Sequence, residues 1–163
     1  MTYKNFSSHP VLRESPSGYS SPADNPVFEV GLGTPSTSRW LGEIQGAHRL
    51  VQTLFQGELL DRYELLDFLV WPGGLFIRLS LKGPSTLGSF LQFLKERSTP
   101  AGESLGAYWD DELQWIQRVP AEKLPESTRT FLQTADRIRG ESFQSRGFSP
   151  NLFFFYRNPR LGG

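Results

Sequence analysis

The sequence contains no cysteine and only two histidines among its 163 residues. The absence of cysteine excludes disulfide bonds, thiolate zinc sites and a cysteine nucleophile. Two histidines are too few for a histidine-rich metal cage. Neither charge is in excess, because 17 Lys and Arg balance 17 Asp and Glu. A strongly basic, histone-like nucleic-acid coat is therefore excluded, although a local basic patch is not.

Long hydrophobic runs are absent as well. The longest strongly apolar run, Leu152–Tyr156, is far shorter than the ~20 residues of a transmembrane helix. The N-terminus lacks the hydrophobic region of a signal peptide, so we expect a cytoplasmic protein with no membrane partner. Dinucleotide-binding, P-loop and serine-elbow motifs are missing too, and Gly31-Leu32-Gly33 is interpreted as the end of a strand.

What is present suits one folded domain of ordinary size, since 37% of the residues are hydrophobic and 13% are aromatic. Residues 1–26 are rich in Ser and Pro, and we expect them to form a disordered leader. Residues 27–163 would then form the domain.

Alternating and apolar segments predict the strands. They lie at Val27–Gly33, Tyr63–Trp71, Leu75–Lys82 and Asn151–Tyr156. The second and third are separated by Pro72-Gly73-Gly74, which predicts a hairpin.

Apolar residues at three- and four-residue spacing predict helices at Arg39–Gly57, Ser85–Arg97 and Pro125–Gly140. The aromatic and acidic segment Tyr108–Arg118 is interpreted as a short helix. Its Asp110-Asp111-Glu112 run would lie at the helix N-terminus, where negative charge is stabilised, because adjacent carboxylates converge poorly on a metal ion.

This order of elements predicts the fold class. A strand, a crossover helix, a hairpin, further helices and a final strand give an α+β ferredoxin-like sandwich. We expect an antiparallel sheet of about four to five strands with helices packed on one face. The other face would be open to a ligand or to a dimer partner.

The hairpin resembles that of HUH-class single-tyrosine transposases, especially the REP-associated tyrosine transposases. That family has the motif Met-Pro-Asn-His-hydrophobe-His, to which Trp71-Pro72-Gly73-Gly74-Leu75-Phe76 corresponds. The family's Tyr-Ile-x-x-Asn-Pro motif corresponds to a segment ending in Asn158-Pro159, which aligns Phe154 with the nucleophilic tyrosine. The Lys-containing Leu94–Arg97 and the Trp-rich segment after it are similar to family segments.

The resemblance implies a site that has lost its chemistry. Gly74 and Phe76 stand where the family has metal-binding histidines, and Phe154 has no hydroxyl to attack a DNA phosphate. Tyr156 lies two residues from the aligned position. We therefore expect no catalytic residue, no metal and no cofactor. The domain would bind structured single-stranded DNA or RNA without cleaving it.

Such binding requires cations for the phosphates and aromatic platforms for the bases. The candidate nucleic-acid-binding residues are Phe76, Arg78, Lys82, Lys95, Arg97, Tyr156, Arg157 and Arg160, with Trp71 as a further platform.

A protein-interaction or dimerisation module with no nucleic-acid role is the alternative. The neutral charge, the four Trp residues and an uncovered sheet face favour it, and a homodimer would fit it. A third interpretation, an enzyme that uses carboxylates or tyrosine, has little support because no positioned histidine accompanies those groups.

Overall fold

The computed structural model describes residues 26–35, 37–38, 40–146 and 153–159. The predicted leader, apart from Pro26, lies outside the described residues. Five strands form one antiparallel sheet in the order β4-β1-β3-β2-β5. The strands are β1 (Val27–Gly33), β2 (Tyr63–Trp71), β3 (Gly74–Leu81), β4 (Asp110–Val119) and β5 (Phe154–Arg157).

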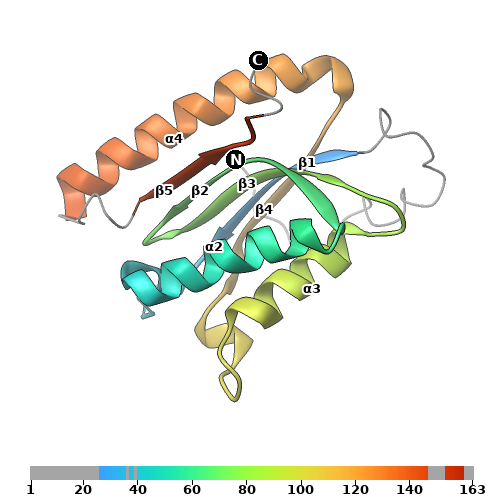
Figure 1. Cartoon of the computed structure of the whole chain (residues 1–163). Coiled ribbons are helices and arrows are strands. Elements are labelled where there is room, and N and C mark those ends of the chain that lie inside the picture. Colours follow the sequence, from blue (N-terminus) through green and yellow to red (C-terminus); the bar gives the residue numbers. More distant parts are fainter. Residues whose placement is uncertain (1–25, 36, 39, 147–152, 160–163) are drawn as a thin grey trace.

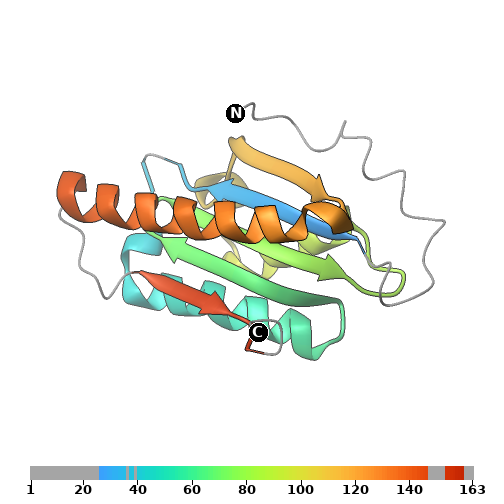
Figure 2. The same cartoon turned by 90° about the horizontal axis from the view of Figure 1, so that it is seen from above.

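Three α-helices lie on the two faces of this sheet. Helices α2 (Ile44–Leu59) and α3 (Leu87–Ser98) cover one face, and α4 (Leu124–Arg146) crosses the other (Figure 1). Figure 2 shows α4 lying lengthwise over the strands on its own side of the sheet. The short helical turns are η4 (Trp40–Gly42), η5 (Leu105–Ala107) and η6 (Ala121–Lys123).

This arrangement confirms the α+β class, and it is consistent with a ferredoxin-like sandwich. The expectation that the helices share one face is wrong. Leu69 and Phe76 point to the face opposite α2 and α3, where they form a second apolar cluster with Phe131 and Ala135 of α4. Burying those side chains requires a cover on that face, and α4 supplies it.

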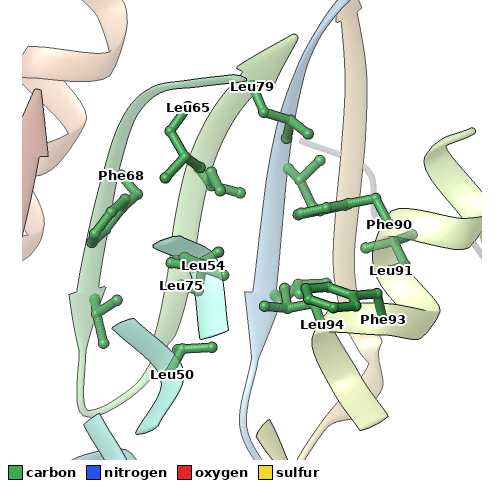
Figure 3. Close-up of a cluster of buried hydrophobic side chains, with 14 of the residues drawn as sticks. Leu50, Leu54, Leu65, Phe68, Leu75, Leu79, Phe90, Leu91, Phe93 and Leu94 are labelled. Carbon is green, nitrogen blue, oxygen red and sulfur yellow. The ribbon is translucent and has the colours of Figure 1, made fainter. Parts of the chain in front are cut away.

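The larger core lies between the sheet and the pair α2 and α3. Figure 3 shows Leu50 and Leu54 of α2, together with Phe90, Leu91 and Leu94 of α3, gathered against the strands. The strand residues labelled there are Leu65, Phe68, Leu75 and Leu79. All of these side chains are at most 2% exposed, so this cluster supplies most of the burial that stabilises the fold.

The predicted helix Arg39–Gly57 begins later than expected. Trp40–Gly42 forms a separate turn, Glu43 is extended, and α2 starts at Ile44. The carbonyl oxygen of Trp40 lies where a Cβ of residue 46 would stand, and only glycine permits that approach. The helix predicted at Ser85–Arg97 is confirmed as α3, and Thr86 and Ser89 close a capping box at its start.

The segment predicted as a short helix, Tyr108–Arg118, is the edge strand β4. Its alternation sends Trp115 to the α4 face, while Ile116 packs into the core beneath α2 and α3. Pairing with β1 satisfies the backbone hydrogen bonds of this polar segment. The tertiary context therefore overrides the local sequence pattern that favoured a helix. The acidic run Asp110–Glu112 therefore begins a strand and caps no helix.

The last strand is shorter than predicted: the expected span Asn151–Tyr156 is replaced by Phe154–Arg157, and residues 151 and 152 lie outside the described part. Asn158, two per cent exposed, ends this strand. Its side-chain amide donates to the Leu65 carbonyl at 2.9 Å, and its backbone N–H donates to the Leu66 carbonyl at 2.8 Å. Asn158 thus has a structural role in fastening β5 to β2.

Two helix glycines give a matched test of this packing. A Cβ at Gly57 would lie 2.2 Å from the Tyr63 hydroxyl, which donates to the Leu54 carbonyl at 2.7 Å. A Cβ at Gly140, inside α4, would meet no neighbouring atom within 4 Å. We expect Gly57→Ala to lower the free energy of unfolding by about 1–3 kcal/mol through overpacking. We expect Gly140→Ala to raise it by up to about 1 kcal/mol through helix propensity.

Urea denaturation followed by circular dichroism measures both changes. Equal effects of the two substitutions would contradict the close packing of Tyr63 against α2.

Candidate functional site

The cations predicted to contact phosphates do not form one surface. Arg78 is 2% exposed and forms a buried ion pair with Asp67, and Lys95 is 8% exposed and pairs with the exposed Asp111. Lys95 donates to the Asp111 carboxylate at 3.0 Å and to the Gln114 side-chain oxygen at 2.6 Å. It therefore fastens α3 to β4, and the prediction that Lys95 contacts a nucleic acid does not fit its position.

The remaining candidates are spread over the molecule. Lys82 pairs with Asp61 at 3.0 Å, and the Arg97 guanidinium lies 5.2 Å from the centre of the Phe93 ring. Arg157 is exposed on β5, and Arg160 lies outside the described residues. Among the described candidates, Arg78 and Arg157 flank Asp67 in the sheet, the first buried and the second exposed. The others do not join them on one surface.

The predicted aromatic platforms are largely part of the apolar clusters. Phe76 is 7% exposed and packs against α4, with its ring centre 4.8 Å from that of Phe131. Tyr156 is half-buried on the α2 side, where its ring lies 4.9 Å from Phe55 and 5.2 Å from Phe68. Phe76 and Arg78 therefore lie beneath α4 instead of on an open sheet face, which corrects the expected binding surface.

Gly74 and Phe154, aligned with a metal ligand and the nucleophile of the transposases, have packing roles here. A Cβ at Gly74 would lie 2.2 Å from the Leu32 carbonyl oxygen, so β1 and β3 approach too closely for any side chain. The Phe154 ring lies 5.5 Å from His48 on α2. Within the described residues, no group of three His, Cys, Asp or Glu is arranged to hold a metal ion.

A groove of about 920 Å³ lies between α4 and the sheet, over β1, β4 and the tip of the hairpin. Strand β1 lies under its floor. Phe28, Val30 and Leu32 point into the core, so Glu29, Gly31 and Gly33 face α4. Two successive positions on that face therefore carry no side chain, and side chains of the neighbouring strand β4 lie over them.

Aromatic and aliphatic side chains line this floor. A Cβ at Gly31 would lie 3.2 Å from the Trp115 ring, and one at Gly33 would lie 2.6 Å from the Leu113 Cβ. Trp115 and Leu113 thus lie across the two glycines. Trp71, at the end of β2, extends the apolar lining. Trp71 and Trp115 are half-buried and Leu113 is 41% exposed, so apolar surface remains accessible in the groove.

Helix α4 forms the wall, and its residues divide into two stripes. Phe131, Ala135 and Ile138 pack on the apolar cluster and seat the helix. Ser127, Thr130 and Thr134, spaced three and four residues apart, line the groove, and the Ser127 hydroxyl is bonded to Arg78 and Glu29. The groove therefore combines an apolar floor with a wall of small hydrogen-bonding groups.

A chain of buried polar groups closes the inner end of the groove. Arg78 donates to both Asp67 carboxylate oxygens, from Nε at 2.8 Å and from Nη2 at 2.7 Å. Its Nη1 donates to Ser127 Oγ at 2.9 Å, and the Ser127 hydroxyl donates to Glu29 Oε2. We call these four residues the polar chain. It links β2, β3 and β1 to the first turn of α4.

The buried charges of the polar chain are not equally compensated. Burial raises the pKa of the Glu29 carboxyl, while the Ser127 hydrogen bond and the charge of Arg78 oppose the rise only in part. Arg78 is matched by two bonds to Asp67, whereas Glu29 has one bond from a neutral hydroxyl. The Glu29 carboxyl is thus the poorly compensated charge of this site.

Sequence reasoning missed Glu29, Gly31, Gly33, Trp115 and Ser127 as site residues. The signal was the alternation of β1: an apolar face beside a face with one carboxylate and two glycines indicates a hollow surface. The role of Ser127 had no such signal, because only the fold brings it beside Glu29, 98 positions away in sequence.

No protein-family model matches the chain, and no curated protein or solved structure is significantly similar to it. The resemblance to tyrosine transposases therefore stays a prediction. Within the part of the chain that the structure describes, no helix is both long enough and apolar enough to cross a membrane.

Arg78 and Lys82 give a matched test of the polar chain, since each forms an ion pair, Arg78 from within β3 and Lys82 directly after it. Arg78→Met leaves the 1%-exposed Asp67 carboxylate without its cation, and we expect a loss of about 3–5 kcal/mol in the free energy of unfolding. Lys82→Met breaks an exposed pair and should cost about 0–1 kcal/mol. Chemical denaturation measures both, and a small effect of Arg78→Met would contradict its structural role.

The raised pKa of Glu29 predicts a pH dependence of stability. Between the ordinary pKa of 4.5 and the raised folded pKa, the folded state binds more protons than the unfolded state. The free energy of unfolding therefore falls as pH rises through this window. Glu29→Gln removes the titration, so its stability relative to the wild type should increase with pH above about 4.5.

Urea denaturation of both proteins between about pH 4 and pH 8 provides the comparison. Burial raises the pKa of Asp67 as well, but that group is present in both proteins and largely cancels. A relative stability that decreases with pH would show that Arg78 outweighs burial at Glu29.

Proposed function

We propose that this protein is a binding module that holds an extended peptide segment of a partner protein in the groove between α4 and the sheet. The groove itself, whose floor is formed by Trp115 and Leu113 lying over Gly31 and Gly33, is the observation that carries the proposal. It leaves an elongated, mainly apolar space beside a helix that carries hydrogen-bonding groups.

The dimensions of the groove favour an extended peptide. The lining runs from Leu113 to Val119 along β4, about 20 Å at 3.3 Å per residue. Along α4 it runs from Glu126 to Ile138, about 18 Å at 1.5 Å per residue. An extended segment of about six residues spans such a length. A volume of 920 Å³ spread over it leaves room for one chain with small or medium side chains.

The chemistry of the lining supports the same occupant. Alternate side chains of an extended peptide would face Trp71, Trp115 and Leu113, because successive side chains point in opposite directions. Its backbone N–H and C=O groups would meet the hydroxyls of Thr130 and Thr134. A peptide backbone buried in a purely apolar groove would lose the hydrogen bonds that its N–H and C=O groups make with water. Hydroxyl groups on the wall can replace those bonds.

Charges at the mouth of the groove are paired. Lys123 lies 3.8 Å from Glu126, and Arg137 lies 3.7 Å from Glu141. The mouth therefore offers no excess of positive charge for the phosphates of a nucleic acid. Single-strand binding remains the second candidate through the resemblance alone, since the described cations do not converge on one surface.

Filling the groove tests the proposal. Thr134→Trp places a large ring at the half-buried wall, while Gln133→Trp adds the same ring at the neighbouring position of α4, which does not line the groove. A displayed library of random dodecapeptides is selected on the wild type. We expect selected peptides to lose at least about tenfold in affinity for Thr134→Trp, or about 1.4 kcal/mol, and to bind Gln133→Trp as before.

Fluorescence polarisation of the labelled peptides measures the affinities, with circular dichroism as the check on folding. Peptides that bind Thr134→Trp as tightly as the wild type would show that the groove is not the site. A labelled DNA hairpin in the same assay, bound in a salt-dependent manner by all three proteins, would favour the second candidate instead.

A further inference from the structure

Glu29 is the charged side chain that the groove encloses most fully. It lines the groove from the centre of the sheet, paired in register with Arg78 of β3 and Gln117 of β4, and is 6% exposed. The other ionisable groups of the lining, Lys123, Glu126 and Arg137, lie at the exposed mouth. An occupant that reaches the floor therefore meets this carboxyl.

The charges around Glu29 do not balance. The guanidinium of Arg78 is taken up by its two hydrogen bonds to Asp67, and Ser127, which lies between Arg78 and Glu29, is neutral. With Glu29 ionised, the buried groups Asp67, Arg78 and Glu29 carry one net negative charge. The next cation, Arg157, is exposed on β5 in register with Asp67, and so acts on Asp67. Among the described residues, Ser127 is the one side chain that hydrogen-bonds to the Glu29 carboxyl.

The geometry points to Glu29 as a cation anchor: the peptide held in this groove carries an ammonium or guanidinium group that pairs with the Glu29 carboxylate at the floor. This inference rests on the proposed function and specifies its ligand. The occupant is an extended, mainly apolar segment with one Lys or Arg side chain, or a free N-terminal amine, directed at β1.

The physical reason is the cost of burying an uncompensated charge. A carboxylate taken out of water is destabilised unless a cation or several hydrogen-bond donors face it. One hydroxyl donates to Glu29, and Arg78 acts on it through its charge alone; the raised pKa of the Glu29 carboxyl reflects this incomplete compensation. An incoming ammonium or guanidinium group would supply the missing positive charge in a partly dry site, where charge-assisted hydrogen bonds are strong.

The same charge would exclude other ligands. An acidic side chain or a phosphate at the floor would meet Glu29 at close range, and like charges in a desolvated groove repel strongly. The anchor therefore selects basic segments and disfavours phosphorylated ones.

The experiment compares matched peptides on matched proteins. Peptides selected on the wild-type full chain, and shown to depend on the groove by their loss on Thr134→Trp, are synthesised with Lys and with norleucine at the basic position. Each is measured on the wild type and on Glu29→Gln, whose amide oxygen can still accept the hydrogen bond from Ser127.

We expect the wild type to bind the Lys peptide at least about tenfold more tightly than the norleucine peptide. On Glu29→Gln this preference should disappear, with the norleucine peptide bound about as well as by the wild type. That pattern requires a direct coupling between Glu29 and the peptide cation, which a general loss of folding would not produce.

Two failures are distinguishable. If groove-dependent peptides contain no Lys, Arg or exposed N-terminal amine, or if the Lys preference persists on Glu29→Gln, the cation anchor is wrong while peptide binding stands. If no selected peptide depends on the groove, the proposed function fails and the anchor fails with it.

Discussion

Strand β1 is the constraint on which the rest of the structure depends. It is an interior strand, paired with β4 on one side and with β3 on the other. The side chains on its two faces therefore decide what can pack on each side of the sheet at this position. Phe28, Val30 and Leu32 fill one face and fix α2 and α3 over the large core. The opposite face carries Glu29 and two glycines, which cannot build a second apolar layer of equal depth. The groove is the direct consequence of this asymmetry.

Helix α4 is positioned by what remains on that second face. The apolar side chains Phe76 and Leu69 attract its Phe131 and Ala135, while the polar chain fixes its first turn through Ser127. Apolar contacts determine how closely the helix lies on β2 and β3, and the buried hydrogen bonds determine where along the sheet it begins. A helix seated over β2 and β3 does not cover the glycine-bearing part of β1, where Trp115 and Leu113 of β4 line the groove instead.

Much of the fold was predictable because its signals are local. The limits of Val27–Gly33 and Tyr63–Trp71 agree with β1 and β2, since alternation and the Pro-Gly turn report directly on strand structure. The edge strand β4 was predicted as a helix because its polar residues carry no clear period and its pairing with β1 is not a local property.

The candidate site was predicted poorly for a related reason: charge and aromaticity identify residues that can bind, but burial decides which of them are accessible. Arg78 and Phe76 have suitable chemistry for a nucleic acid, and α4 covers both.

The sequence by itself determined the α+β class, the hairpin and the absence of thiol chemistry, because these follow from periodicity, turn residues and composition. It also determined that β1 has one apolar face and one face of Glu29, Gly31 and Gly33. Only the tertiary structure decided that α4 crosses to that second face and that Ser127 meets Glu29 and Arg78 there. The reason is that a long amphipathic helix can cover either side of a sheet, and the choice depends on apolar area and hydrogen-bond partners supplied by strands distant in sequence.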